Sequence, residues 1–450
     1  MTNHHHNSIN ATHDPALRSW VTSANDAGTD FPIQNLPFGV FHVKPSTGPA
    51  RCGVAIGDQI LDVSAIASLL DEGLARTAAQ ACAQPQLNEL MALGSAAASA
   101  LREGLSRLLN ADQTTQREVV AQALHPMSEA QLLMPVKVAG YTDFFASVHH
   151  ATNAGRLFRP DAPLLPNYKY VPVAYNGRAA SVRVSGDRVQ RPWGQIKPAD
   201  QAAPVFAPAQ RLDYEVELGM YVGSASRDGE PVSVAHAWEH VFGFSLLNDW
   251  SARDIQSWEY QPLGPFLAKG FATSVSPWVV TAQALAPFRT ALAARAEGDP
   301  GPLPHLFDAQ DQHNGGLNIH MQAQLRTARM RASGAPAQRL SLSNTDTLYW
   351  SFAQMLAHHT SNGGAVATGD LMGSGTVSGA SAQALGSLLE ITRGGAEPLT
   401  VAATGEARTF LQDGDEVIFS ARCEAPGRVS IGFGQCAATL QPAIERGAPA

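Results

Sequence analysis

The sequence predicts a mainly β protein of the α+β class, with two domains of unequal size. Its 450 residues exceed the length at which a single hydrophobic core usually stops growing, which favours two domains. Residues with helical spacing are concentrated between 65 and 124, whereas short strand-like runs separated by Gly and Pro dominate after residue 135. These patterns divide the chain into a small first domain and a large, strand-rich second domain.

The first domain is expected over 31–134, after a flexible leader at 1–30 that is polar and lacks an apolar signal core. Its boundary with the next domain falls near 126–135. The predicted elements are strands at 35–41 and 52–63, the latter broken by a turn at Gly57 and Asp58, and two or three helices between 65 and 124.

The second domain is expected over 135–445. Apolar runs bounded by turn residues predict its strands, and helical periodicity predicts two helices. The predicted elements are strands at 180–184, 216–222, 242–248, 416–421 and 429–433, helices at 233–241 and 347–360, and a long irregular insertion at 284–316.

The composition favours a small molecule as the partner. A formal net charge of -8 and the absence of a long Lys and Arg block argue against nucleic acid and anionic membrane. No window approaches the roughly 20 apolar residues that a membrane span requires. The cysteines form no Cys-x-x-Cys pair, so we expect reduced thiols and a cytoplasmic location. They are Cys52, Cys82, Cys423 and Cys436.

Two glutamates mark a candidate metal site. Glu215 and Glu217 are two residues apart in a strand-like run, so the period of a strand places both carboxylates on one face. Such a pair is either solvated or held together by a cation, and hard ions such as Ca²⁺ and Mg²⁺ select carboxylate oxygens. Asp143 and Asp249 are candidates to complete the set of ligands.

Polar groups gather at two further places. The stretch 247–260 places acids, an arginine, an amide and a tyrosine beside an apolar run, and polar groups are costly to bury unless paired. His150 follows Asp143 by seven residues in a glycine-flanked segment, where the pair His149-His150 is either structural or catalytic. Both places are therefore candidates for an active site.

Other motifs are weaker. The pattern His236-Ala237-Trp238-Glu239-His240 satisfies the His-x-x-Glu-His spacing of some zinc peptidases, but it lies in a predicted helix that leads into a strand. Four glycines between 369 and 379 are followed by no Walker lysine and open no helix, so nucleotide binding is not expected.

Several ordered blocks resemble the fumarylacetoacetate hydrolase family, from Tyr141 to Gln435, and the block at 35–41 extends the similarity into the first domain. Agreement over many blocks in order is far more specific than any one motif. The blocks are YTDF, HATN, YNGRA, LDYEVELG, NDWSARDIQSWEYQPLGPFLAKGF, TSVSPWVV, GSGTVSG, GSLLE, LQDGDEV and IGFGQC.

The resemblance implies a small SH3-like N-terminal barrel, a large C-terminal mixed β-roll domain and a homodimer. The metal ligands of the family, for Ca²⁺ or Mg²⁺ or both, fall on Asp143, Glu215, Glu217 and Asp249. A second cation site would fall on Asp249, Lys269 and Thr273. An ammonium group cannot ligate a metal, so Lys269 would contribute its backbone carbonyl.

The activity implied by the resemblance is metal-dependent hydrolysis of the carbon–carbon bond of 4-fumarylacetoacetate, a diketo diacid, to fumarate and acetoacetate. This is the final step of tyrosine and phenylalanine degradation. His150, oriented by Glu390, would take a proton from water. The oxyanion would be held by Arg253, Gln256 and Lys269.

The substrate-binding positions of the family fall on Arg159, Tyr175, Tyr260 and Thr376, while Phe145 stands where the family usually has a tyrosine. One alternative keeps the fold and changes the substrate, as in hydrolases, decarboxylases or isomerases of the superfamily that act on acylpyruvates or related diketo acids. Another is an inactive metal-binding dimer, against which the presence of both His150 and Glu390 argues.

Overall fold

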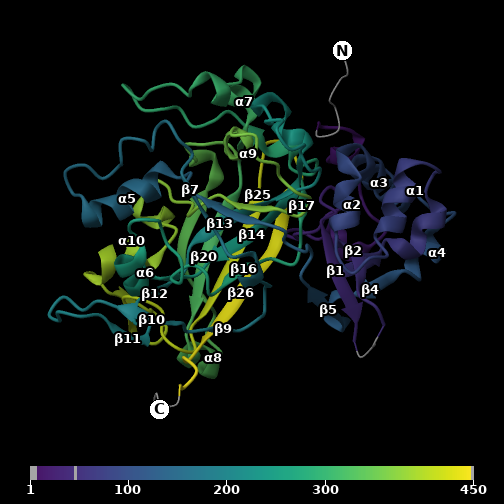
Figure 1. Ribbon diagram of the computed structural model, residues 1–450. Coiled ribbons are helices and arrows are strands. Elements are labelled where there is room, and N and C mark those ends of the chain that lie inside the picture. The colour runs from purple at the N-terminus through teal and green to yellow at the C-terminus, as the bar shows by residue number, and fades with distance from the viewer. Residues whose placement is uncertain (1–7, 45–47, 447–450) are drawn as a thin grey trace.

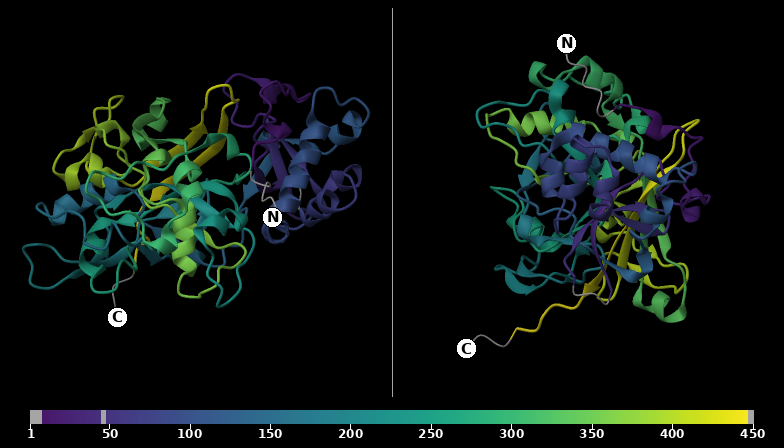
Figure 2. Two further views of the ribbon diagram at one scale, coloured as in Figure 1. Left: turned by 90° about the horizontal axis from the view of Figure 1, so that it is seen from above. Right: turned by 90° about the vertical axis from the view of Figure 1, so that its right-hand side faces the viewer.

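The computed structural model describes residues 8–44 and 48–446, which form two domains lying side by side (Figure 1). The small N-terminal domain, coloured purple to blue, packs against one end of a larger domain that contains two long sheets. The same division is visible from two further directions (Figure 2).

The small domain is built on five antiparallel strands: β1 (Phe38–Val43), β2 (Arg51–Ile56), β3 (Gln59–Asp62), β4 (Leu124–Pro126) and β5 (Ala130–Leu133). Their order in the sheet is β4-β3-β2-β1-β5. The predicted turn joins β2 to β3, and Gly57 takes a φ of 57° there, which a glycine adopts without steric cost.

Four helices cover this sheet in the described residues, whereas the residue spacing predicted two or three. They are α1 (Leu74–Ala81), α2 (Asn88–Ala92), α3 (Gly94–Leu109) and α4 (Arg117–Ala121). On α3, the side chains of Leu101, Leu105 and Leu108 are fully buried and share one apolar core with Val40 and Val54 of the sheet. Their spacing places them on a single face of the helix.

Residues 8–30 differ from the flexible leader that their polar composition suggested. They form 3-10 turns at Ala11–His13 and Thr22–Asn25 and lie against the rest of the protein. The Ser19 hydroxyl donates to the carbonyl of Leu109 at 2.8 Å. Polar hydrogen bonds hold this segment in place, which apolar periodicity cannot reveal. Residues 1–7 of the expected leader lie outside the described residues.

The large domain contains a mixed sheet in the order β7-β6-β22-β13-β14-β16-β8, with β17 also paired to β14. The parallel pairs are β6 with β22 and β8 with β16. The strands are β6 (Tyr141–Phe144), β7 (Ala174–Asn176), β8 (Val182–Val184), β13 (Val216–Val222), β14 (Val241–Asp249), β16 (Thr273–Val275), β17 (Val280–Thr281) and β22 (Leu371–Gly373).

A second sheet has the order β21-β20-β25-β26-β9, and its strands are β9 (Val189–Gln190), β20 (His320–Arg326), β21 (Gln338–Asn344), β25 (Glu416–Cys423) and β26 (Ile431–Gln441). The two sheets enclose one large apolar core, to which Leu218 and Leu246 contribute from the first sheet and Met321 and Phe419 from the second. The fold is therefore a sheet-rich mixture of strands and short helices.

Short elements surround the two sheets. The strand pairs are β10 (Trp193–Ile196) with β11 (Val205–Pro208), β12 (Leu212–Asp213) with β15 (Ser251–Ala252), β18 (Arg289–Thr290) with β19 (Gly316–Leu317), and β23 (Leu399–Thr400) with β24 (Ala407–Arg408). The helices are α5 (Val148–Phe158), α6 (Arg253–Glu259), α7 (Ala309–Asn314), α8 (Ala328–Ser333), α9 (Phe352–Thr360) and α10 (Leu388–Ile391).

Three predicted segments differ in detail. The helix expected at 233–241 is a 3-10 helix, Val234–Glu239, because the apolar run that starts at Val241 already belongs to the buried strand β14. The helix expected at 347–360 begins later, at α9, where the Ser351 side chain caps the amide of Gln354. The insertion at 284–316 is more regular than expected, since it contains β18 and α7.

An apolar interface joins the two domains. The rings of Phe38, on β1, and Phe242, on β14, lie 6.0 Å apart. Phe38 and Val279 also exchange backbone hydrogen bonds of 3.0 and 2.7 Å. Because β14 runs from this interface to Asp249, one strand connects the domain contact to the candidate metal site. No helix in the described part of the chain is long and apolar enough to cross a lipid bilayer.

Candidate active site

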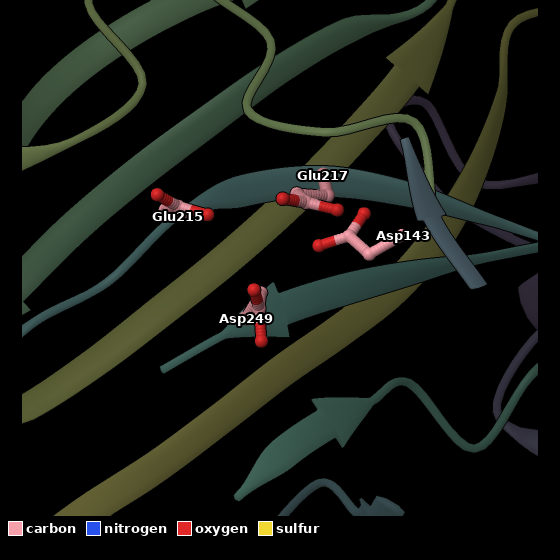
Figure 3. Close-up of side chains that lie close together, drawn as sticks. All are labelled: Asp143, Glu215, Glu217 and Asp249. Atoms are coloured by element: carbon pink, nitrogen blue, oxygen red, sulfur yellow. The ribbon is translucent and has the colours of Figure 1, made fainter. Parts of the chain in front are cut away.

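Four buried acids from three strands and their edges meet in the large domain (Figure 3). Asp143 belongs to β6, Glu217 to β13 and Asp249 to the end of β14, while Glu215 immediately precedes β13. One carboxylate oxygen of each residue lies within 4.8 Å of those of the other three. Together these four residues form the carboxylate cluster.

A glycine makes the closest approach in this cluster possible. Gly373 on β22 lies between β6 and β13, directly opposite Asp143 in the parallel register. A Cβ atom at this position would collide with Oδ1 of Asp143 and lie 2.9 Å from Oε2 of Glu217. The absence of a side chain at residue 373 therefore leaves room for the carboxylates of Asp143 and Glu217 to face each other.

Cationic side chains neutralise one end of the cluster. The ammonium group of Lys269 lies 2.5 Å from Glu215 and 2.6 Å from Asp249, and Arg253 lies 2.8 Å from Glu215. Although burial favours the protonated acid, Lys269 and Arg253 hold the pKa of Glu215 below its ordinary value. Glu215 is therefore a carboxylate in a pocket of positive charge.

The other end of the cluster has an excess of negative charge. Burial, followed by the charge of Asp249, raises the pKa of Asp143 well above its ordinary value. Burial and the charge of Asp143 raise the pKa of Glu217 in the same way. Neither Asp143 nor Glu217 takes part in an ion pair among the described residues. A cation placed there would favour the ionised form of both acids.

The cluster fits a divalent cation. Both oxygens of Glu217 are buried and accept no hydrogen bond from the residues that the structure describes. The Tyr175 hydroxyl is 2.6 Å from Asp249 and 3.1 Å from Asp143, which orients one oxygen of each. All four donors are hard carboxylate oxygens of the kind that Ca²⁺ and Mg²⁺ prefer. A cation between Asp143 and Glu217 would satisfy the uncompensated oxygens.

A histidine and a glutamate lie beside the cluster. His150 is in the first turn of α5, where the Ser147 hydroxyl accepts its amide at 3.3 Å. Its Nδ1 is 2.7 Å from Oε2 of Glu390 on α10. Because a carboxylate can only accept, Nδ1 carries the proton and Nε2 of the neutral ring is free to accept one. Nε2 lies 3.9 Å from Oε1 of Glu215.

Glu390 is fixed by three hydrogen bonds in addition to the one from His150. Asn153 donates to Oε1 at 2.9 Å, and Ser378 and Ser387 each donate to Oε2 at 2.9 Å. Burial opposes ionisation, but His150, Asn153 and Ser378 hold the pKa of Glu390 below its ordinary value. The glutamate is thus a fixed, ionised acceptor for Nδ1.

Sequence comparison identifies the family. A model of the fumarylacetoacetate hydrolase C-terminal domain matches residues 140–441, and a model of the fumarylacetoacetase N-terminal domain matches residues 34–135. The chain belongs to the fumarylacetoacetate hydrolase family.

Curated relatives match over nearly their whole length. The fumarylacetoacetase of Rattus norvegicus is 43% identical over 430 residues, which cover 95% of this chain and 99% of the relative. That of Arabidopsis thaliana is 42% identical over 433 residues, with the same coverage of both chains. Among solved structures, a fumarylacetoacetate hydrolase from Exiguobacterium antarcticum has a TM-score of 0.49 and 17% identity, covering 90% of this chain and 99% of that one.

The remaining positions that the family resemblance suggested are distributed around the cluster. Gln256 lies one turn after Arg253 on α6 and accepts its N–H at 3.1 Å. Thr273 is at the edge of the cluster, with its hydroxyl 3.5 Å from Asp249. Lys269 presents its ammonium group to the acids, as its ion pairs show. Phe145 places its ring edge-on to His150, with centroids 5.3 Å apart.

Three suggested substrate residues make no direct bond to the carboxylate cluster within the described part of the chain. Arg159 donates to the carbonyl of Pro163 at 3.1 Å. The Tyr260 hydroxyl accepts from Gln261 at 3.2 Å, and the residue is 36% exposed. Thr376 is buried, and its hydroxyl has no hydrogen-bond partner among the described residues. These side chains retain free capacity for a ligand.

The zinc-peptidase spacing at 236–240 does not form a metal site of its own. His236 pairs with Glu239 at 2.7 Å on the surface of a 3-10 helix. Within the described residues, the carboxylate cluster is the one group of at least three side chains arranged to hold a metal.

The sequence analysis missed four residues that organise this family site: Asn153, Asp213, Ser378 and Ser387. Helical and strand periodicity could have indicated two of them. Asn153 follows His150 by three residues on α5, and Asp213 precedes Glu215 by two in an alternating acidic run. Ser387 precedes Glu390 by three residues, in the Ser-x-x-Glu spacing typical of a helix N-terminus. Ser378 carries no such signal, because the fold brings it to Glu390.

Proposed function

We propose that this protein hydrolyses the carbon–carbon bond of 4-fumarylacetoacetate to fumarate and acetoacetate, the last step of tyrosine and phenylalanine degradation. The observation that carries the proposal is the placement of His150: Glu390 fixes Nδ1 at 2.7 Å, and Nε2 faces the carboxylate cluster. The relatives that match over 95% of this chain are named fumarylacetoacetases, which supports the choice of substrate.

His150 acts as the general base in this proposal. Its free Nε2 takes a proton from water, and the resulting hydroxide attacks the carbonyl carbon of the fumaryl group. Glu390 stabilises the imidazolium that forms, because its carboxylate already accepts the Nδ1–H. The tetrahedral intermediate then collapses, the carbon–carbon bond breaks, and fumarate leaves while the electron pair remains on the acetoacetate enolate. Protonation of this enolate completes the reaction.

The oxyanion of the intermediate is held by Arg253, Gln256 and Lys269. Oε1 of Gln256 accepts from Arg253, which leaves its amide N–H group as a donor. Arg253 and Lys269 are both buried, so their charges are poorly screened by water. Fixed donors of this kind stabilise the developing charge without reorganisation.

The carboxylate cluster is proposed to hold Ca²⁺, Mg²⁺ or both, through Asp143, Glu215, Glu217 and Asp249. A divalent cation supplies Lewis-acid stabilisation of the diketone oxygens and of the enolate product. The second site suggested by the resemblance, at Asp249, Lys269 and Thr273, would use the carbonyl of Lys269, since the ammonium group repels a cation.

The carboxylates of the substrate are proposed to bind the side chains of Arg159, Tyr175, Tyr260 and Thr376. The unpartnered Thr376 hydroxyl supports this choice. Phe145 stands where the family usually has a tyrosine, so it offers the substrate no hydroxyl group. Its ring instead packs edge-on against His150. We further propose an SH3-like barrel for the small domain, a β-roll for the large one, a homodimer and a cytoplasmic location.

The test is an assay of purified protein with fumarylacetoacetate. Equal amounts of fumarate and acetoacetate should form, and a chelator should abolish their release until Ca²⁺ or Mg²⁺ is restored. An acylpyruvate serves as the competing substrate. If the acylpyruvate is cleaved and fumarylacetoacetate is not, the chain has the family fold with another substrate.

His150→Ala is the matched variant for this assay. Removing a general base should lower kcat by about 10²- to 10⁴-fold. The metal content should be unchanged by elemental analysis, because His150 is not one of the four acids. Near-normal turnover in this variant would exclude His150 as the base, whatever the substrate.

A further inference from the structure

Asp213 is a fully buried carboxylate that the proposed reaction leaves without a role. It ends β12 and accepts four N–H groups. Its Oδ1 accepts the amides of Tyr214 and Leu388, both at 2.8 Å. Its Oδ2 accepts the Leu389 amide and the Nε–H of Arg253, both at 3.0 Å, and it forms an ion pair with Nη2 of Arg253 at 2.9 Å.

These bonds reach both halves of the site. The same terminal nitrogen of Arg253 that meets Asp213 also lies 2.8 Å from Oε1 of Glu215. The two leucine amides open α10, the helix that carries Glu390, the partner of His150. Among these residues, Asp213 alone contacts both Arg253 and α10, the helix that carries Glu390.

The chemistry of the position requires a carboxylate. All four residues that contact its carboxylate do so through N–H groups, and an ionised carboxylate offers acceptors alone. An asparagine of the same shape would turn an NH₂ group toward donors and leave at least one buried N–H without an acceptor. An asparagine side chain would also bind the guanidinium of Arg253 more weakly than the charged Oδ2 does.

We propose that Asp213 is a positioning residue that couples Arg253 to the His150–Glu390 pair and so fixes the oxyanion donor relative to the general base. The kinetic part of this proposal rests on the proposed function. Small misplacements of reacting groups cost large factors in rate, so Asp213 acts on kcat without touching the substrate.

The first test compares Asp213→Asn with Asp415→Asn. Asp415 is a similarly buried aspartate that accepts two nitrogens of Arg408, at 2.8 and 3.1 Å, and the Gln412 amide; none of these partners is a proposed catalytic residue. Asp213→Asn should lower kcat by about 30-fold with KM within about 3-fold, and Asp415→Asn should leave both nearly unchanged. Equal kinetic losses in the two variants would overturn the proposal.

The second test is a double-mutant cycle with Arg253→Gln. If Asp213 acts through Arg253, Asp213→Asn should cost less than about 3-fold in kcat once the arginine is gone. Losses that multiply would overturn the coupling. If Asp213→Asn fails to fold, Arg253→Lys replaces it: a lysine cannot bridge Asp213 and Glu215 with a planar fork, so it should lose nearly as much kcat as Arg253→Gln. Near-normal kcat in Arg253→Lys would overturn the proposal.

A third measurement needs no substrate. The Nδ1 proton of His150, bonded at 2.7 Å to Glu390, should give a downfield proton NMR signal that His150→Gln removes. This signal should shift or broaden in Asp213→Asn and stay in place in Asp415→Asn. An unmoved signal would overturn the coupling to the base. A wild-type protein without turnover would instead overturn the proposed function, and the NMR comparison would still decide the role of Asp213.

Discussion

At the residue scale, the site is defined by an imbalance of charge. Four buried acids share the two cations Lys269 and Arg253, and Arg253 is itself shared with Asp213. The excess falls on Asp143 and Glu217, whose pKa values burial raises. A buried, uncompensated negative charge is costly, so this end of the cluster gains most from a bound cation.

Gly373 provides a test of this argument. A Cβ at position 373 would collide with Asp143 and press on Glu217, so Gly373→Ala should lower Ca²⁺ or Mg²⁺ affinity by at least about 10-fold, measured by calorimetry. Gly219→Ala is the matched control, because Gly219 faces Gly373 across β13 and β22, and its Cβ would meet the apolar side chains of Leu371 and Leu247. Equal affinities in the two variants would contradict the proposed position of the cation.

The sequence could predict only part of this cluster from physical pattern. The spacing of Glu215 and Glu217 follows directly from the period of a strand, and Asp249 follows from its place at the end of an apolar run. The position of Asp143 depends on the parallel pairing of β6 with β22, two strands far apart in the chain. No local pattern encodes such a pairing, so for this residue the family resemblance was the more specific guide.

At the scale of elements, the insertion at 284–316 acquires a structural role. Arg295 donates to the carbonyl of Lys169 at 3.1 Å and to the Tyr349 hydroxyl at 2.8 Å, and Asp299 forms an ion pair with Lys169. Lys169 belongs to the segment between α5 and β7. In that segment the Tyr168 hydroxyl donates to the Phe145 carbonyl at 2.9 Å. The insertion therefore holds the loop that connects Arg159 to Tyr175.

Arg295→Ala should loosen this loop. If the loop presents Arg159 and Tyr175 to the substrate, KM for fumarylacetoacetate should rise by about 3- to 10-fold while kcat stays within about 2-fold. Initial rates give both constants. The control is Arg393→Ala, which removes an exposed arginine paired with Glu397. An unchanged KM in Arg295→Ala would mean that the loop is held without the insertion.

Element boundaries were harder to predict than the elements themselves. The segment 233–241 has helical character, yet Val241 already pairs with Val222 in the buried sheet, and burial on both faces decides its conformation. The sequence of the insertion at 284–316 shows no helical or strand periodicity. Its short elements are stabilised instead by tertiary contacts, such as the hydrogen bond from Ser351 to Asp311 on α7, at 2.7 Å. Tertiary contacts therefore determine what local propensity leaves open.

At the scale of the whole molecule, the N-terminal segment connects the two domains. Arg102 on α3 donates to Thr12 at 3.0 Å, and Nε2 of His13 lies 2.9 Å from the carbonyl of Gln283 in the large domain. The apolar interface around Phe38 and Phe242 continues this contact. Since β14 spans from the interface to Asp249, loss of the small domain would expose the strand that carries one acid of the carboxylate cluster.

His13 should make the stability of this assembly depend on pH. Burial and the charge of Arg102 lower the pKa of His13 from 6.5 to about 4. Its Nδ1 accepts the Asn10 amide at 3.0 Å, so Nε2–H donates to Gln283 and the ring is neutral in the folded protein. Between these two pKa values the unfolded chain binds a proton that the folded protein does not. The contribution of His13 is therefore complete above pH 6.5 and is lost as the pH falls toward 4.

The expected size follows from about 1.4 kcal/mol for each pH unit between the two pKa values, or about 2 kcal/mol between about pH 7 and about pH 5. His13→Gln keeps a donor for Gln283 and does not titrate, so its free energy of unfolding should fall by about 2 kcal/mol less than that of the wild type over this interval. Urea unfolding at the two pH values measures both. Buried carboxylates contribute equally to the pH dependence of both proteins, so their effect cancels when the two free energies of unfolding are compared. If these free energies change in parallel with pH, His13 is not held neutral at the junction of the domains.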